Sequence, residues 1–144
     1  MSAVMFERAD PGGLVHPVRA TLLAGTVPLF LGALLSDAAY ATTYEVQWKN
    51  FAAWLLMGAE VFAGLALLWG LVGLFGARQR AGRPVLAFVL LLATFAVGFV
   101  DALVHAMDAW QSMPAGLVLS VVAAVLAVAA TACGLVEHRA GRPA

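Results

Sequence analysis

Residues 84–107 are PVLAFVLLLATFAVGFVDALVHAM, an apolar segment that opens on proline and holds two ionisable residues near its far end, Asp101 and His105. An α-helix rises about 1.5 Å per residue, so about 20 apolar residues span the hydrocarbon core of a bilayer. A proline at the first turn of a helix costs little, because the N–H that it lacks would have no partner there. The segment therefore predicts a transmembrane helix.

Three other segments meet the same criterion, at residues 20–40, 51–75 and 115–136. The chain of 144 residues is 63% hydrophobic and 11% charged, with a mean hydropathy of +0.94. Soluble domains are about 45–50% apolar and about 25% charged, and a chain of this size could not bury the excess apolar surface. The sequence predicts an all-α integral membrane protein, residues 1–144 forming a single domain folded as a four-transmembrane-helix bundle.

The basic residues are divided unequally between the two sides of the predicted membrane. One side holds Arg8, Arg19, Arg78, Arg80, Arg83, Arg139 and Arg142, and the other holds Lys49. Connections rich in arginine and lysine stay in the cytoplasm. We therefore expect both termini inside the cell (N-in and C-in), in a multi-pass protein of the bacterial inner (cytoplasmic) membrane. The expected partners are the lipid bilayer and, as a further hypothesis, a second copy in a homodimer or a larger membrane complex.

Ionisable side chains within the predicted spans are the candidate functional residues, because such groups are costly in lipid and usually mark a function or a buried partner. Counted from the outer helix ends, Glu60 lies about 13 Å deep and Asp101 about 10 Å deep. Asp37 and Asp108 are expected at or near the outer surface. Asp101, His105 and Asp108, at i, i+4 and i+7, share one helix face. We expect an acidic, histidine-containing site that opens outward between spans one, two and three.

Several kinds of chemistry fit these residues. Carboxylate and imidazole groups suit a divalent metal such as zinc, manganese or iron, with Asp101, His105, Glu60, Asp37 and Asp108 as candidate ligands. Glu60, Asp101 and His105 could instead relay protons. The structural alternative is a hydrogen bond between Asp101 and His105 that only caps the outer end of a tight bundle. These alternatives stay open.

A haem b group is a further candidate cofactor, with His105 holding the iron from one side. A haem between two histidines of one chain is difficult, because His16 and His138 lie about 25–30 Å from His105 along the membrane normal. His16 and His138 could face each other at the inner surface, or two copies of the chain could each supply His105. His16 and His105 are therefore the candidate cofactor-binding residues.

Other classes of function lack a sequence signal. The chain has no G-x-S-x-G, H-E-x-x-H or P-loop motif, so the sequence does not predict a hydrolase, a kinase or a nucleotide-binding enzyme. Its 8 basic and 8 acidic residues give no net charge, and without a basic stripe we expect no nucleic-acid partner. A single cysteine, Cys133, excludes an intrachain disulfide or a thiolate metal cluster.

The first half of the chain carries a specific set of features. They are His16-Pro17 opening span one, Pro28 within it, Gly32 and Leu34-Leu35-Ser36-Asp37 towards its end, Thr42-Thr43 in the loop, and Trp48, Phe51-Ala52-Ala53-Trp54-Leu55-Leu56 and Gly58 at the entry to span two. In these features residues 14–75 resemble a bacterial membrane-protein family known as domain of unknown function 2231. Such proteins have four spans. In the second half Arg83-Pro84 stands where that family commonly has a histidine.

The resemblance implies a supporting role in electron transfer, because related domains are found joined to cytochrome c-like or Rieske-like modules. The residues that match the family pattern are His16, Pro17, Asp37 and Trp54. The leading hypothesis is a redox-associated membrane component, linked to haem or quinone, with an outward-facing Glu/Asp/His site. The alternatives are a protein that binds or transports a cation or proton at the same site, and a structural subunit of a membrane complex.

Overall fold

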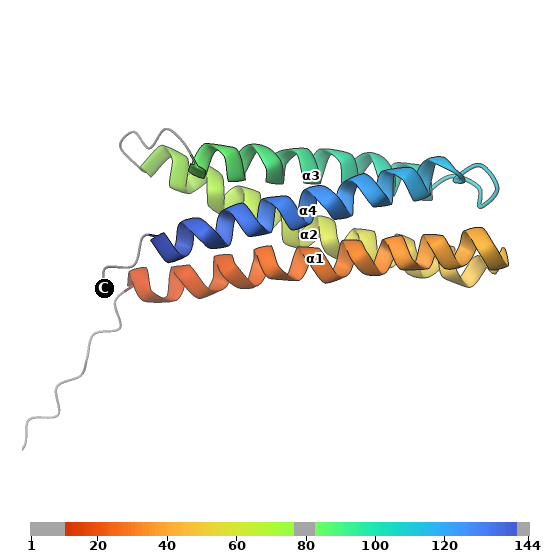
Figure 1. Ribbon diagram of the computed structural model, residues 1–144, viewed down its shortest axis with the longest axis horizontal. Helices are drawn as coiled ribbons and strands as arrows, with labels where there is room; N and C mark the ends of the chain where they lie inside the picture. The colour runs from red at the N-terminus through yellow and green to blue at the C-terminus, as the bar shows by residue number, and fades with distance from the viewer. Residues whose placement is uncertain (1–10, 77–82, 141–144) are drawn as a thin grey trace, which may run out of the picture.

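The computed structural model describes residues 11–76 and 83–140, and the side chains of residues 17–72 and 85–136. This part of the chain forms four α-helices: α1 (Pro11–Thr43), α2 (Val46–Gly76), α3 (Arg83–His105) and α4 (Ala115–Ala140) (Figure 1). Each contains a segment long and apolar enough to cross a membrane, and the described residues include no strand. The predicted four-span, all-α membrane architecture is confirmed.

The helices form a bundle in which each runs antiparallel to the next (Figure 1). Helix α1 packs against α2 and α4, and α3 packs against the same two helices, whereas α1 and α3 lie diagonally, without backbone contact. We call the end with the start of α1 and the end of α4 the terminal end, and the end where α1 meets α2 the distal end. A residue of α1 can therefore reach α3 only through side chains that meet in the centre of the bundle.

The distal helix ends are set by local chemistry. Tyr44, between α1 and α2, has a left-handed φ of 58° and donates its N–H to the carbonyl of Tyr40 at 2.8 Å, a common way for a helix to stop. Helix α3 ends at His105, and the chain turns before α4 begins at Ala115. The sequence prediction placed the end of span three at Met107, because the apolar character continues past the point where the helix stops.

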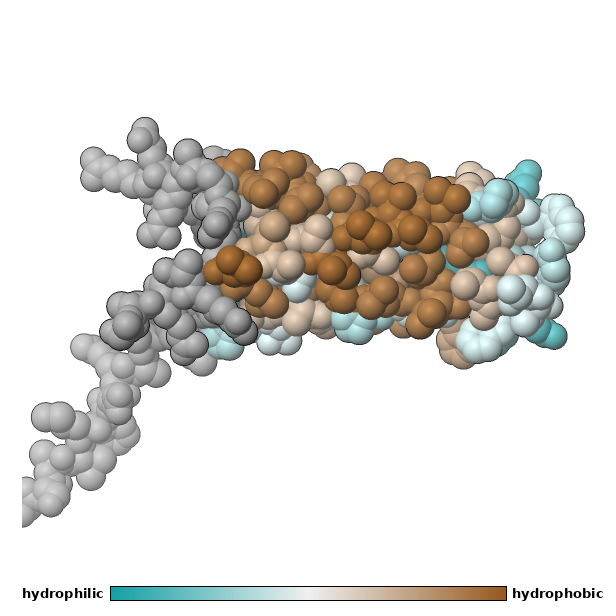
Figure 2. Space-filling view, viewed as in Figure 1, coloured by the Kyte–Doolittle hydropathy of each residue, from teal (hydrophilic) through white to brown (hydrophobic). Residues whose placement is uncertain are grey.

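Small side chains fill much of the interior. The alanines that are 0% exposed are Ala33, Ala52, Ala59, Ala63, Ala123 and Ala127. Small residues let helix backbones approach closely, which strengthens van der Waals packing between helices in lipid. Many large apolar side chains lie outside, where they form a hydrophobic belt along the middle of the bundle, and polar residues gather at the distal end (Figure 2). An apolar exterior around a small-residue interior suits a bilayer.

Ala127→Leu should destabilise the bundle, because the interior between the helices has no room for the added carbons. We expect the free energy of unfolding to fall by about 1–3 kcal/mol, measured by thermal denaturation in detergent. Val128→Leu is the matched control, since Val128 is 47% exposed on the outside of the same helix. Similar losses in both variants would contradict the close packing of α4.

The direction of insertion stays a prediction, and it can be tested by cysteine labelling. In a Cys133→Ser background, a membrane-impermeant maleimide should label Trp110→Cys in intact spheroplasts, because Trp110 is 80% exposed in the α3–α4 connection. Ser2→Cys should be labelled only after permeabilisation. The opposite pattern would place the termini outside the cell.

Candidate functional site

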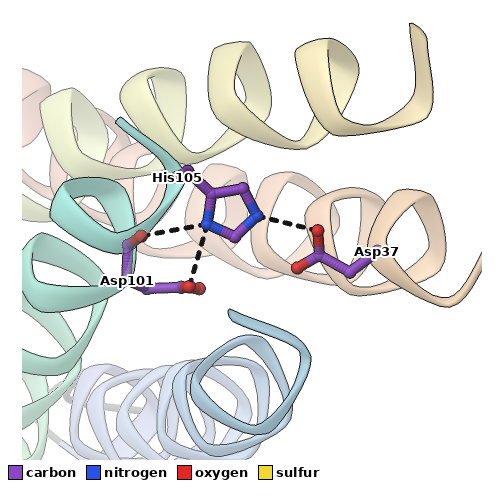
Figure 3. Close-up of side chains that lie close together, drawn as sticks. All are labelled: Asp37, Asp101 and His105. Carbon is purple, nitrogen blue, oxygen red and sulfur yellow. Dashed lines mark hydrogen bonds and ion pairs between the residues drawn. The ribbon is translucent and has the colours of Figure 1, made fainter. Parts of the chain in front are cut away.

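Three ionisable side chains meet in the centre of the bundle near the distal end. Asp37 comes from α1, and Asp101 and His105 come from α3 (Figure 3). Both carboxyl residues are 0% exposed and His105 is 5% exposed. Asp101 and His105 share a face because they are four residues apart on one helix. The three side chains thus join two helices whose backbones are not in contact.

His105 lies between the two carboxyl groups. Its Nε2 is 2.8 Å from Asp37 Oδ1, and its Nδ1 is 2.9 Å from the backbone carbonyl oxygen of Asp101. A carbonyl oxygen only accepts hydrogen bonds, so Nδ1 carries a proton and donates it to that carbonyl. Asp101 Oδ1, at 3.1 Å from Nδ1, adds an electrostatic contact. The tautomer is thereby fixed, and Nε2 faces Asp37 alone.

The contact between Asp37 and His105 requires one proton. Where Nε2 lacks a proton, the Asp37 carboxyl carries it and donates to the ring. Where Nε2 carries it, the imidazolium donates to the Asp37 carboxylate. The two forms differ only in the position of the proton along a hydrogen bond of 2.8 Å. A proton can therefore move between the two residues while their heavy atoms stay in place.

Ser120 of α4 completes the site, and the sequence analysis missed it. It is 0% exposed, and its hydroxyl makes hydrogen bonds with Asp37 Oδ2 and, at 2.9 Å, with Asp101 Oδ2. A signal was present, because Ser120, Ala123 and Ala127 are small residues at helical spacing and mark the interior face of α4. We call the group of Asp37, Asp101, His105 and Ser120 the distal cluster.

The hydrogen bonds at Ser120 call for a further proton. A serine hydroxyl has one proton and donates to one carboxyl group at a time, so the second carboxyl group must be protonated to donate to Oγ. If both carboxyl groups are ionised and His105 is an imidazolium, the distal cluster has one net negative charge, and one of the two contacts of Ser120 lacks a proton. One added proton neutralises the charge and completes that hydrogen bond. An uncompensated charge is costly in such a place, so the geometry favours the proton-loaded form.

Glu60 of α2 lies beside the distal cluster rather than within it. It is 9% exposed, and neither of its carboxyl oxygens has a hydrogen-bond partner. Its Oε1 lies against Gly98, one turn before Asp101 on α3. The neighbourhood of Glu60 and Asp101 agrees with the similar depths that the sequence gave them.

The structure departs from the sequence prediction at several points. Asp108 does not share a helix face with Asp101 and His105, because α3 ends at His105 and Asp108 is exposed in the turn that follows. Asp37, which was expected at or near the outer surface of the membrane, lies near the distal end of α1, where its side chain is 0% exposed between the helices. The site is closed between α1, α3 and α4 instead of opening outward between the first three spans, because inward-facing small residues of α4 let Ser120 reach both carboxyl groups.

The distal cluster suits some of the expected cofactors better than others. A haem iron needs a free ring nitrogen, but Nδ1 of His105 donates to a carbonyl and Nε2 contacts Asp37, so His105 does not fit as an axial ligand. His16 lies on α1 about 30 Å from Asp37 along the helix, and its side chain is outside the described residues. For a divalent metal, ligand atoms of Asp37, Asp101 and His105 lie within 4.8 Å of one another.

A cavity of about 370 Å³ lies at the distal end of the bundle, and none of the residues of the distal cluster lines it. Its lining residues are Tyr40, Ala41, Tyr44, Ala109, Trp110, Met113, Pro114 and Leu117. Tyr40 lies one turn beyond Asp37 on α1, and Leu117 lies one turn before Ser120 on α4. Tyr44 and Trp110 are exposed and stack with their ring centroids 6.2 Å apart. The cavity therefore lies between the buried cluster and the distal surface of the protein.

Four apolar helices around a buried group of ionisable side chains define a multi-pass membrane protein. The chain belongs to the family of predicted membrane proteins designated domain of unknown function 2231 (DUF2231), whose family model matches residues 15–137. The match includes all four spans, so it extends well beyond residues 14–75, where the resemblance was recognised. No curated protein and no solved structure matches the chain significantly.

Ser120→Ala should destabilise the protein, because it leaves an oxygen of each carboxyl group without its hydroxyl partner. We expect a loss of about 1–3 kcal/mol in the free energy of unfolding, measured by denaturation in detergent. Thr131→Val is the control, since this buried hydroxyl donates only to the carbonyl of Leu23, at 3.0 Å, and should contribute about 1 kcal/mol. A Ser120→Ala loss no larger than the control would show that the hydroxyl does not couple the two carboxyl groups.

Proposed function

We propose that this protein binds and transfers protons within the membrane, and that the distal cluster is its proton-binding site. The observation that carries the proposal is the placement of His105, with one ring nitrogen fixed as a donor and the other sharing a proton with Asp37. Ionisable groups at such depth commonly belong to proton relays. A purely structural contact between the helices would not require two acids and a histidine, because apolar packing would hold the helices together equally well.

Access from the distal side supports the same proposal. The cavity of about 370 Å³ reaches the turns of α1 and α4 that adjoin Asp37 and Ser120, and it is large enough to hold several water molecules. We infer that protons enter there. The arginine asymmetry of the sequence makes this the outer face of the bacterial inner membrane. A homodimer or a larger complex remains a prediction.

A redox-associated role rests on the family resemblance. Haem has little support at the distal cluster, because both ring nitrogens of His105 are engaged. A quinone-linked role is compatible with a proton site, because reduction of a quinone consumes protons. The redox role would then depend on the proton transfer proposed here.

A divalent metal site is the second candidate, and the compact set of ligand atoms favours it. Only one ring nitrogen can face a given ion, so Nε2 and Asp37 would bind the metal while Asp101 orients the ring through Nδ1. Equilibrium dialysis against zinc or manganese, followed by elemental analysis, separates this candidate from proton transfer. One equivalent of metal that is lost in Asp37→Asn would favour the metal.

Asp37→Asn and His105→Gln should both slow proton flux, because each removes a group that carries the shared proton. The purified protein is placed in liposomes with a potassium gradient and valinomycin, and a dye inside the liposomes reports their pH. The unmodified protein should acidify the interior, and the variants should do so at least about tenfold more slowly. Asp108→Asn is the matched control, since it makes the same change at an exposed distal residue. Folded variants with unchanged flux would contradict proton transfer and favour a structural role for the cluster.

A further inference from the structure

Three buried side-chain oxygens have no hydrogen-bond partner among the described residues. They are both oxygens of Glu60 and Oδ1 of Asp101. The two residues come from neighbouring helices, α2 and α3, and Glu60 Oε1 lies against Gly98, one turn before Asp101. The Asp101 carboxyl group still has Ser120 at Oδ2 and His105 Nδ1 within 3.1 Å of Oδ1, whereas the Glu60 carboxyl group has no donor in the described part of the chain. Two neighbouring buried carboxylates repel each other, and a proton on one of them removes that repulsion.

The carboxyl group of Glu60 lies deeper in the bundle than the distal cluster. Its Oε1 stands where a Cβ atom of residue 98 would be. Gly98 precedes Asp101 by one turn of α3, so the Glu60 carboxyl lies about 5 Å further towards the middle of the membrane. Glu60 is therefore the next acid on a path that leads from the distal cluster inward.

Gly98 makes the space that this carboxyl group occupies. A Cβ atom there would overlap Glu60 Oε1 and would lie 2.8 Å from the ring of Phe30, which is itself 0% exposed. The apolar ring on one side and the helix backbone on the other leave no side-chain donor for the carboxyl group. An ionised carboxylate without donors is costly in such surroundings, whereas a protonated carboxyl group carries no charge.

We infer that Glu60 is a second, deeper proton site that is filled from Asp101, and that Gly98 is the positioning residue that keeps the two acids adjacent. This inference rests on the proposed function. In the transfer step the O–H bond of the protonated Asp101 carboxyl group breaks and an O–H bond forms on the Glu60 carboxylate. Asp101 is left as a carboxylate that a proton from the Asp37–His105 pair neutralises again through Ser120. No electron is transferred, and the charge moves inward with the proton.

Infrared spectroscopy of the purified protein tests the protonation of Glu60. Buried protonated carboxyl groups give C=O stretching bands that shift in heavy water. Glu60→Gln should remove the contribution of Glu60 and leave that of the protonated carboxyl group in the distal cluster. Glu45→Gln is the matched control, because Glu45 is exposed between α1 and α2, and it should leave the bands intact. Absence of such bands from the unmodified protein, or bands of unchanged intensity in Glu60→Gln, would overturn the inference.

Flux measurements in liposomes test the position of Glu60 on the path. Gly98→Ala should slow proton flux by about tenfold to a hundredfold, because a displaced carboxyl group loses its alignment with Asp101. The shorter side chain of Glu60→Asp in the same protein should restore flux, which separates positioning from misfolding. A Glu60→Gln protein with full flux would remove Glu60 from the path. That result would leave the distal cluster as the proton site if Asp37→Asn still abolished flux.

Discussion

The distal cluster depends on one constraint, which is that a charged group inside a membrane must be neutralised and hydrogen-bonded where it stands. His105 meets this constraint for two helices at once, because it donates to the carbonyl of Asp101 and shares a proton with Asp37. Since α1 and α3 do not touch through their backbones, side chains join them across the bundle, and His105 makes the hydrogen bond between the two helices. In the proposed function, the same bonds that hold the helices together also carry the proton that is transferred.

The packing of the bundle serves this arrangement. Alanine positions such as Ala59 and Ala127 bring the helices close enough for short side chains to meet in the centre. Gly98 has no side chain, and this leaves space for the carboxyl group of Glu60. Stability and the candidate chemistry therefore rest on the same residues, and a change at Ser120 is expected to affect both.

The sequence predicted several residues of the candidate site. Asp101, His105 and Glu60 stood out because ionisable groups are rare in apolar segments, and the structure brings these three close together. Ser120 did not stand out, because a hydroxyl is common in such segments and only a partner on another helix gives it a role. Asp108 was included because helical spacing was extended past His105, where the helix ends.

The sequence by itself determined the four spans, because the free energy of moving apolar residues from water to lipid depends on composition along the chain and not on contacts between helices. It also determined that acids and a histidine would lie within them. Only the tertiary structure decided that Asp37 and Ser120 close the cluster with His105, while Asp108 stays outside. Those choices depend on which helices are neighbours and how each is rotated, and these follow from side-chain packing between segments far apart in the chain.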